Sequence, residues 1–239
     1  MNRLVLSQRL LTVSRHVRDG AFLADIGSDH GYLPIYLLQK GKIKRAIISD
    51  INEGPLNTAR ENAALSGVCD RVDFFLSNGA LEFLNYPFTD VSVCGMGGEL
   101  ICSIIENAPS FKNEGVRLIL QPMSKQSVLR KYLCENGFEI LFEEYSLDAG
   151  KYYLTLVAHY TGEKKEISDI YEELGDIDTR VKLNRAETGY LKAKARSLRK
   201  SISGKQKANI NTLSEEELLL KINQILNSKG WENESKGAL

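Results

Sequence analysis

Apolar and polar positions follow two different patterns along this chain, and the change between them falls near Thr161. Between Ala21 and Tyr160, short apolar runs alternate with longer stretches whose apolar residues lie three and four positions apart. Short apolar runs are typical of buried strands, and the longer spacing is typical of helices that pack on them. The pattern therefore predicts repeated strand–helix units, and with them a parallel sheet covered by helices on both faces.

The expected elements follow from this pattern and from glycine or proline near their ends. We expect strands at 21–26, 46–50, 72–76, 91–94, 116–120, 138–146 and 152–160, and helices at 32–40, 52–66, 98–107 and 125–136. Only Leu147–Lys151 separates the last two strands, so we expect them to pair as an antiparallel hairpin at one edge. The predicted fold class is α/β, a Rossmann-like, doubly wound sheet with an antiparallel edge hairpin.

The second pattern is a heptad repeat that runs from Ile167 to Ile202. It predicts one long helix, ended by Gly204, with Asn184 inside its apolar stripe. A capping box expected at Ser214–Glu217 opens a further apolar stripe and predicts a second helix. Two such helices joined by a short polar loop predict a coiled-coil-like α-helical hairpin at the C-terminus.

We therefore expect two domains, one at 1–161 and one at 162–239. The polar residues from Ser228 onward are expected to fray.

Composition excludes several classes of protein. The 239 residues carry 31 Lys and Arg against 31 Asp and Glu, and their apolar content is too high for a disordered chain. No apolar run approaches the length of a membrane span, and arginines interrupt the N-terminal segment, so we expect neither a membrane protein nor a signal peptide. The four cysteines form no CxxC pair and have no histidine at metal-ligand spacing, so we expect no metal and a cytoplasmic location.

The balanced total charge conceals a strongly basic segment. Between Thr179 and Lys207 there are ten Lys and Arg residues and the single acid Glu187, which gives a net charge of 10 − 1 = +9. A second basic segment, residues 1–18, holds four arginines and no acid. Localised positive charge on an otherwise acidic chain favours a polyanionic partner, although a solvated helix face is the alternative.

The candidate chemistry begins at the end of the first expected strand, in the segment Asp25-Ile-Gly-Ser-Asp-His-Gly31. Ligands bind at the carboxyl ends of such strands, and Gly27 allows a tight turn there. Asp29 stands where the dinucleotide fingerprint has its middle glycine. Two carboxylates in one loop disfavour a phosphate and favour a ligand that carries an amino group.

Three later strand ends carry further candidates. Asp50 ends the second strand, where it could accept hydrogen bonds from ribose hydroxyls. Asn78-Gly79 follows the third strand, and Cys94-Gly-Met-Gly-Gly98 follows the fourth. Each feature alone could be a helix cap or a turn, but together at successive strand ends they favour a ligand-binding cleft.

These segments, with Tyr32-Leu-Pro34 and Gln121-Pro122, resemble the class I S-adenosylmethionine-dependent methyltransferases, and more narrowly the bacterial tRNA (adenine-N1)-methyltransferases of the TrmK family. The resemblance implies transfer of a methyl group from S-adenosyl-L-methionine to N1 of a D-arm adenine, at tRNA position 22. The implied cofactor-binding residues are Asp25, Gly27, Ser28, Gly31, Asp50, Ile51, Asn78, Gly79 and Gly95. The general class has glycine where this chain has Asp29, and we interpret this departure as a feature of the subfamily.

Substrate contacts are expected from the cleft and from the basic segments. Asp29 is the candidate catalytic residue, because a carboxylate would stabilise the cationic base that forms, although it could equally contact the cofactor or cap a helix. Met96 and Tyr32 are candidates to contact the target base, Tyr32 with a core role as the alternative. The candidate tRNA contacts are Arg9, Lys192, Arg196 and Arg199.

Two other functions stay open from the sequence. The same fold could methylate a small molecule, although the basic segment argues against this. Alternatively, the heptad repeat could be a non-catalytic module that pairs with another chain, with Asn184 setting the register. The second, shorter helix favours pairing within the chain, so we expect a monomer.

Overall fold

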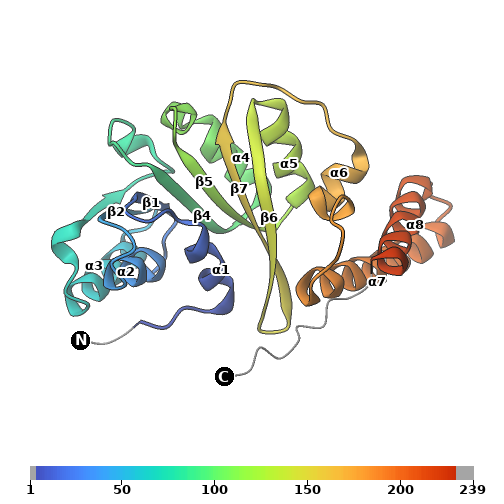
Figure 1. Ribbon diagram of the computed structural model, residues 1–239, viewed down its shortest axis with the longest axis horizontal. Helices are drawn as coiled ribbons and strands as arrows, with labels where there is room; N and C mark the ends of the chain where they lie inside the picture. The colour runs from blue at the N-terminus through green and yellow to red at the C-terminus, as the bar shows by residue number, and fades with distance from the viewer. Residues whose placement is uncertain (1–3, 230–239) are drawn as a thin grey trace. The chain divides into compact units, whose positions relative to one another are not determined.

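The structure is a computed structural model that describes residues 4–229. Its centre is a seven-stranded sheet in the order β3-β2-β1-β4-β5-β7-β6. All neighbouring pairs are parallel except β5–β7 and β7–β6 (Figure 1). The strands are β1 (Phe22–Ile26), β2 (Arg45–Asp50), β3 (Val72–Leu76), β4 (Asp90–Gly97), β5 (Arg117–Ser124), β6 (Phe138–Asp148) and β7 (Lys151–Tyr160). The predicted parallel sheet with an antiparallel edge hairpin is confirmed.

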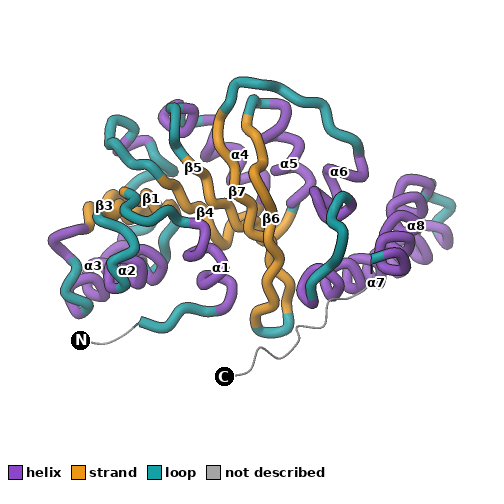
Figure 2. The backbone as a smooth tube through the Cα atoms, in the orientation of Figure 1, coloured by secondary structure: helices purple, strands orange, loops and turns teal. Residues whose placement is uncertain are grey.

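Helices cover both faces of the sheet (Figure 2). They are α1 (Gln8–His16), α2 (Tyr32–Gln39), α3 (Glu53–Leu65), α4 (Gly98–Glu106) and α5 (Gln126–Glu135), with short 3₁₀ turns at Cys69–Arg71, Leu81–Phe83 and Pro109–Lys112. The buried side chains of α1, α2 and α3 share one hydrophobic cluster with β2, which includes Val13, Leu37, Ile48 and Ala59. The helices α4 and α5 pack against each other and against β5.

The edge hairpin turns within two residues. Asp148 pairs with Lys151, and the intervening Ala149 and Gly150 both have positive φ values, of 46° and 77°. Two successive left-handed residues are what a two-residue type I′ turn requires, because its twist matches that of the strands. The turn is therefore tighter than the five-residue connection that the sequence suggested.

A buried charge pair ties this hairpin to α5. Arg130 of α5 and Glu143 of β6 are both fully buried at their side chains, and Arg130 Nε donates to Glu143 Oε1 at 2.6 Å. Arg130 Nη2 also donates to the Tyr145 hydroxyl at 3.0 Å. Buried charges are tolerated when they are paired and hydrogen-bonded in this way.

The second compact unit begins at Asp169. It contains α6 (Asp169–Leu174), a 3₁₀ turn at Gly175–Asp178, α7 (Arg185–Lys207) and α8 (Leu213–Ser228). The prediction of one continuous helix from Ile167 to Ile202 is therefore wrong. Its physical reason lies at Asn184, which accepts from the Glu187 N–H while Glu187 accepts from the Asn184 N–H. This reciprocal capping box starts a new helix at the place where the heptad pattern predicted a seam position.

Other details of this unit also differ from the prediction. Val181, assigned to the apolar stripe, is 88% exposed, because it lies in the segment between the helices. Gly204 lies inside α7 rather than at its end. The predicted capping box at Ser214–Glu217 is wrong, because α8 starts after Thr212, so Ser214 lies inside the helix, and the Thr212 side chain makes no capping hydrogen bond.

The helical hairpin itself is confirmed, since α7 and α8 pack against each other. They bury a set of aliphatic side chains, Leu191, Ala195, Ile202, Leu218, Ile222 and Ile225. Most of the tail that we expected to fray lies outside the described residues.

Candidate active site

A cleft of about 880 Å³ opens at the carboxyl ends of β1, β2, β3 and β4. The strand order reverses between β1 and β4, which is where open α/β sheets bind their ligands. Twelve of the predicted site residues line this cleft: Arg9, Asp25, Gly27, Ser28, Asp29, Tyr32, Asp50, Ile51, Asn78, Gly79, Gly95 and Met96. Residues 70 positions apart in the sequence are thus brought to one cavity by the topology of the sheet.

Asp25 is the buried acid of the cleft. It is the penultimate residue of β1, with an exposed fraction of only 4%, and its carboxylate accepts from the Ser92 hydroxyl at 2.5 Å and from the Ser28 hydroxyl. Burial raises the pKa of Asp25 to about 6, although both hydroxyl donors and the positive charge of Arg9 lower it. Asp25 is therefore a carboxylate near neutral pH that a bound cation would stabilise further.

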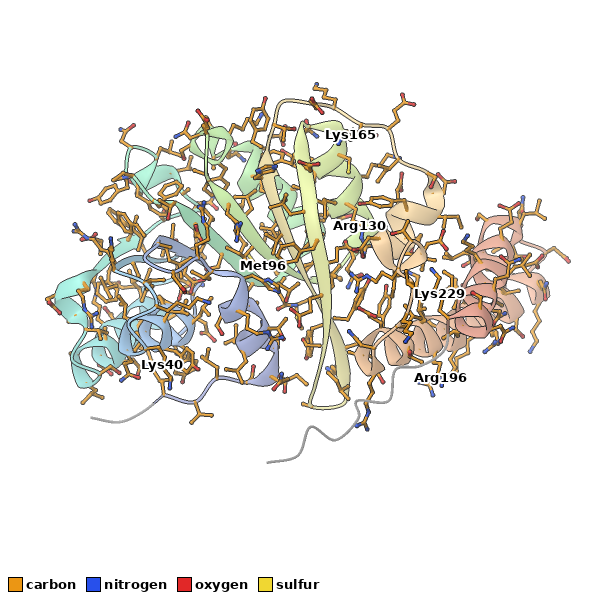
Figure 3. All side chains as sticks on the ribbon, in the orientation of Figure 1. Lys40, Met96, Arg130, Lys165, Arg196 and Lys229 are labelled. Carbon is orange, nitrogen blue, oxygen red and sulfur yellow. The ribbon has the colours of Figure 1, made fainter. Side chains whose placement is uncertain are left out.

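Position 27 requires glycine for two reasons, its backbone conformation and the closeness of the Met96 side chain. Its φ is +65°, and a Cβ there would lie 1.9 Å from the Met96 Cε atom. The Gly27 and Ser28 N–H groups both donate to the Ser49 carbonyl, at 2.9 and 3.1 Å. The turn after β1 is thus fixed to β2, and Met96 (labelled in Figure 3) lies over it.

Asp29 follows in a left-handed conformation, with φ of 52°. Its side chain is 70% exposed, and its Oδ1 atom lies 3.5 Å from His30 Nε2. Tyr32 is partly exposed, and its ring centroid lies 5.3 Å from that of His30. Asp29 and Tyr32 therefore lie at the open side of the cleft, in contrast to Asp25.

The wall formed by β2 and β3 combines acceptor and apolar groups. Asp50 Oδ1 accepts from the Asn52 N–H at 2.8 Å, while its other carboxylate oxygen has no hydrogen-bond partner among residues 4–229. The next side chain, Ile51, is 64% exposed although it is apolar. Gly79 has φ of +69°, and Asn78 beside it is exposed.

Two buried polar residues to which the sequence assigned no role support the site. Ser92 is the donor to Asp25, and Gln121 is fully buried within β5. Gln121 Oε1 accepts from Arg9 Nη1 at 2.5 Å and from the Gly95 N–H at 3.2 Å. Gln121 was part of the family motif, but no signal in the sequence assigned it this bridging position.

Gly31 is the one predicted cofactor-binding residue that does not line the cleft. It precedes α2 with φ of +71°, and a Cβ there would approach Ile48 Cδ1 to 2.9 Å and the Ala59 side chain to 3.1 Å. Close packing against Ile48 and Ala59 therefore explains why residue 31 is a glycine. Its contact with a cofactor stays a prediction.

The predicted tRNA-contacting residues of the second unit lie on the exposed side of α7 (Arg196 in Figure 3). Lys192, Arg196 and Arg199 are exposed, and none forms an ion pair within residues 4–229. By contrast, Lys194 pairs with Glu173 at 2.6 Å and Lys205 pairs with Glu215 at 2.9 Å. The basic segment therefore divides into residues with acidic partners and an exposed set without them, of which Arg199 donates through Nη2 to Asn223 Oδ1 at 3.1 Å.

The N-terminal arginines behave differently from those of α7. Arg15 pairs with Glu144 at 2.5 Å, and Arg18 pairs with the buried Asp90 at 2.6 Å. Of the arginines in this region that the structure describes, Arg9 alone lines the cleft.

Other chemistry receives little support from the described residues. Burial raises the pKa of the Cys94 thiol, so this cleft residue is not an activated thiolate. Within residues 4–229, no cluster of three or more His, Cys, Asp or Glu side chains could hold a metal ion. None of the helices in the same range is long and apolar enough to cross a membrane.

Comparison with known proteins places this cleft in context. Residues 6–156 match the methyltransferase domain family. The tRNA (adenine(22)-N(1))-methyltransferase of Bacillus subtilis (strain 168) is 36% identical over 159 residues, which is 66% of this chain and 66% of that protein.

Two solved structures extend the similarity across nearly the whole chain. Sp1610 of Streptococcus pneumoniae, in complex with S-adenosyl-L-methionine, is 30% identical with a TM-score of 0.81, covering 93% of this chain and 100% of the other. M. capricolum TrmK, in complex with S-adenosyl-homocysteine, is 27% identical with a TM-score of 0.79, covering 94% and 99%.

Proposed function

The chain belongs to the methyltransferase domain family, as a class I S-adenosylmethionine-dependent methyltransferase of the TrmK family, and from this premise we propose that it methylates N1 of adenine 22 in the D-arm of tRNA. The observation that carries the proposal is the cleft at the ends of β1, β2 and β4, in which acidic, apolar and glycine positions are arranged for a charged nucleoside. The substrate is proposed from the names of the relatives and from the exposed basic side of α7.

The residues of the cleft fit S-adenosyl-L-methionine. The free carboxylate oxygen of Asp50 would accept from ribose hydroxyls, and the exposed Ile51 side chain beside it would cover the adenine ring. Asp25 would face the ammonium group of the methionine moiety, which explains a carboxylate held in a buried position. Gly79 and Gly95, both with positive φ, line the cleft without side chains that would fill it.

The bound cofactor supplies an electrophilic methyl group on a sulfonium. Adenine N1 already has a lone pair, so the protein needs no base to activate it. The product base is cationic, and the exposed Asp29 carboxylate would stabilise that charge and accept from the exocyclic amine. Tyr32 and Met96 are the candidates to hold the base against the cleft.

The target N1 is not accessible while the base is paired, so the base has to leave its stacked position. Binding energy from elsewhere on the tRNA must drive this step. The exposed cations of α7 recur along one side of the helix: Arg185, Lys192, Arg196, Arg199, Lys200 and Lys207. At 1.5 Å per residue they extend over about 33 Å, enough to follow several successive phosphates. Phosphate contacts of this kind position a substrate without reading its sequence.

The proposal is tested by incubating the purified full chain with S-adenosyl-L-methionine and unmodified tRNA, followed by nuclease digestion and mass spectrometry. We expect 1-methyladenosine in the tRNA, and none in a matched tRNA with guanine at position 22. Methylation of both tRNAs would reject the position, and methylation of neither would reject the activity. Methylation of a small molecule independent of salt would favour the alternative function.

We also propose that the chain acts as a monomer in the cytoplasm. The apolar side chains of α7 pack on α8 within the chain, and Asn184 caps a helix instead of lying in a seam. Both observations argue against the coiled-coil interaction module. Sedimentation at several concentrations tests the monomer, and a stable dimer would refute it.

A further inference from the structure

A second cavity, of about 810 Å³, lies between the N-terminal segment and the C-terminal ends of α2 and α3. Its lining is mainly apolar, and Leu4, Leu11 and Tyr36, which contribute to it, pack against the hydrophobic core cluster. The walls of the cavity are therefore fixed by the core of the protein. A volume of this size with a largely apolar lining is typical of sites for small molecules.

Two cations line the second cavity. Lys40, the C-cap residue of α2 (labelled in Figure 3), is exposed, and Arg71 is half-buried. Neither forms an ion pair within residues 4–229, whereas Arg45 pairs with Asp73 at 2.9 Å. A half-buried guanidinium in apolar surroundings lacks the counter-charge that burial usually requires.

The ends of the two helices account for only part of this positive charge. Arg71 Nη1 donates to the Leu38 carbonyl at 3.4 Å, and cations are favoured at a helix C-terminus because of its partial negative charge. That charge is about −0.5 for each of α2 and α3, or about −1 together, against the two full positive charges of Lys40 and Arg71. A net positive charge therefore remains beside an apolar cavity, and it favours an anionic ligand.

We propose that the second cavity binds a small amphipathic organic anion. Its apolar body would lie among Leu4, Leu11 and Tyr36, and its carboxylate or sulfonate would pair with Arg71 and Lys40. Arginine suits this contact because its planar donors match a carboxylate. The inference goes beyond the proposed methyl transfer, since none of the residues predicted to bind cofactor or tRNA lines this cavity.

The second cavity shares a wall with the cleft at the strand ends. Val5 and Leu6 line both of them. Leu6 belongs to the hydrophobic core cluster, and the N–H of the neighbouring Leu4 donates to Gln39 Oε1 at 3.4 Å. A ligand that moves this segment in one cavity changes the wall of the other, so the two binding equilibria should be coupled. This coupling rests on the cofactor binding in the cleft.

The test is a fluorescence titration of the full chain with 8-anilinonaphthalene-1-sulfonate, an aromatic anion that fluoresces in apolar sites. The cleft is first saturated with S-adenosylhomocysteine, so that the probe reports on the second cavity. We expect saturable binding, and displacement of the probe by octanoate at a concentration about 10- to 100-fold lower than by 1-octanol, which has the same chain without the charge. The affinity for S-adenosylhomocysteine should change about fivefold or more in saturating octanoate, and the affinity for octanoate by the same factor in return.

The double variant Lys40→Gln with Arg71→Gln should bind the probe about 10- to 100-fold more weakly and should no longer prefer octanoate to 1-octanol. The matched control is Lys44→Gln with Arg60→Gln, which removes one lysine and one arginine charge from exposed positions outside the cavity and should behave as the wild type. Lys40→Gln alone changes an exposed side chain, so it tests the charge without disturbing the bond from Arg71 to α2. It should show part of the loss.

Two results would overturn the proposed site: no binding of the probe by the wild type, or equal binding by the wild type and the double variant. Binding that appears only after residues 1–3 are deleted would assign the cavity to the chain's own N-terminus and would overturn it as well. An unchanged affinity for S-adenosylhomocysteine in saturating octanoate would refute the coupling. If S-adenosylhomocysteine itself does not bind, the proposed function fails, and the titration without it still tests the second cavity.

Discussion

The exposed cations of α7 lead to a quantitative prediction about tRNA binding. Lys192, Arg196 and Arg199 are exposed and have no acidic partner within residues 4–229. Changing all three to glutamine should leave the fold intact, because the side-chain hydrogen bond that is lost, from Arg199 to Asn223, is exposed to solvent. Each phosphate contact contributes about 0.7 to 0.9 to the slope of log K against log salt. Loss of three contacts should therefore reduce this slope by about 2 to 3.

The same numbers predict the loss of affinity. At about 0.1 M salt, three lost contacts correspond to tRNA binding that is weaker by on the order of 100-fold. Fluorescence anisotropy with labelled tRNA, repeated between about 50 and 200 mM salt, measures both the affinity and the slope. The affinity for S-adenosylhomocysteine should not change, because none of the three residues lines the cleft.

A control with the same change in net charge separates local contacts from overall charge. Lys44, Lys112 and Lys164 are exposed lysines outside α7, and their joint replacement by glutamine also removes three positive charges. This variant should keep the wild-type slope to within about one unit. Equal slopes for the two triple variants would refute the reasoning, because net charge alone would then explain the salt dependence.

Three further predictions concern the cleft. Asp29→Asn should lower kcat about 10- to 100-fold with unchanged KM values, in steady-state assays with tRNA, and full activity would exclude Asp29 from the mechanism. Because the pKa of Asp25 is raised to about 6, its carboxyl is protonated below that pH and loses the charge that an ammonium needs. Calorimetry should therefore show the affinity for S-adenosylhomocysteine falling by up to about tenfold per pH unit below pH 6, and a flat profile would contradict this role. Gly27→Ala should lower the free energy of unfolding by about 1–2 kcal/mol because of the positive φ, and further because of the clash with Met96. In thermal unfolding, the double variant with Met96→Ala should regain only part of the lost stability. Full recovery would show that the backbone is not strained.

Most of the cleft was predictable because its residues follow the ends of strands. Asp25, Asp50 and Gly95 each end an apolar run, and the carboxyl ends of parallel strands meet at one edge. Ser92 escaped prediction because it lies inside a strand run, and Gln121 was quoted only as part of the family motif, with no role assigned to it. A single polar residue in such a run gives no sign of which side chain it will meet across the sheet.

The helical unit shows where a periodic pattern misleads. Apolar residues at heptad spacing continued through Gly175–Asp178, with Ile177, and across the segment before α7, with Val181, so the pattern predicted one helix. The Asn184–Glu187 capping box was visible in the sequence and is the stronger signal, since it satisfies backbone donors that a continuous helix would bond internally. Local hydrogen-bonding chemistry outweighed the apolar repeat here.

The charge pair between Arg130 and Glu143 limits how this part of the chain can diverge. Replacing either residue alone would leave the charge of the other buried without a partner. This would lower the free energy of unfolding by about 3–5 kcal/mol, against a typical total of about 5–15 kcal/mol. Substituting both together with well-packed apolar residues can be nearly neutral. Any stepwise replacement of these two residues therefore passes through a single mutant of low stability. For this reason the contact between α5 and the edge hairpin should persist even where other surfaces vary.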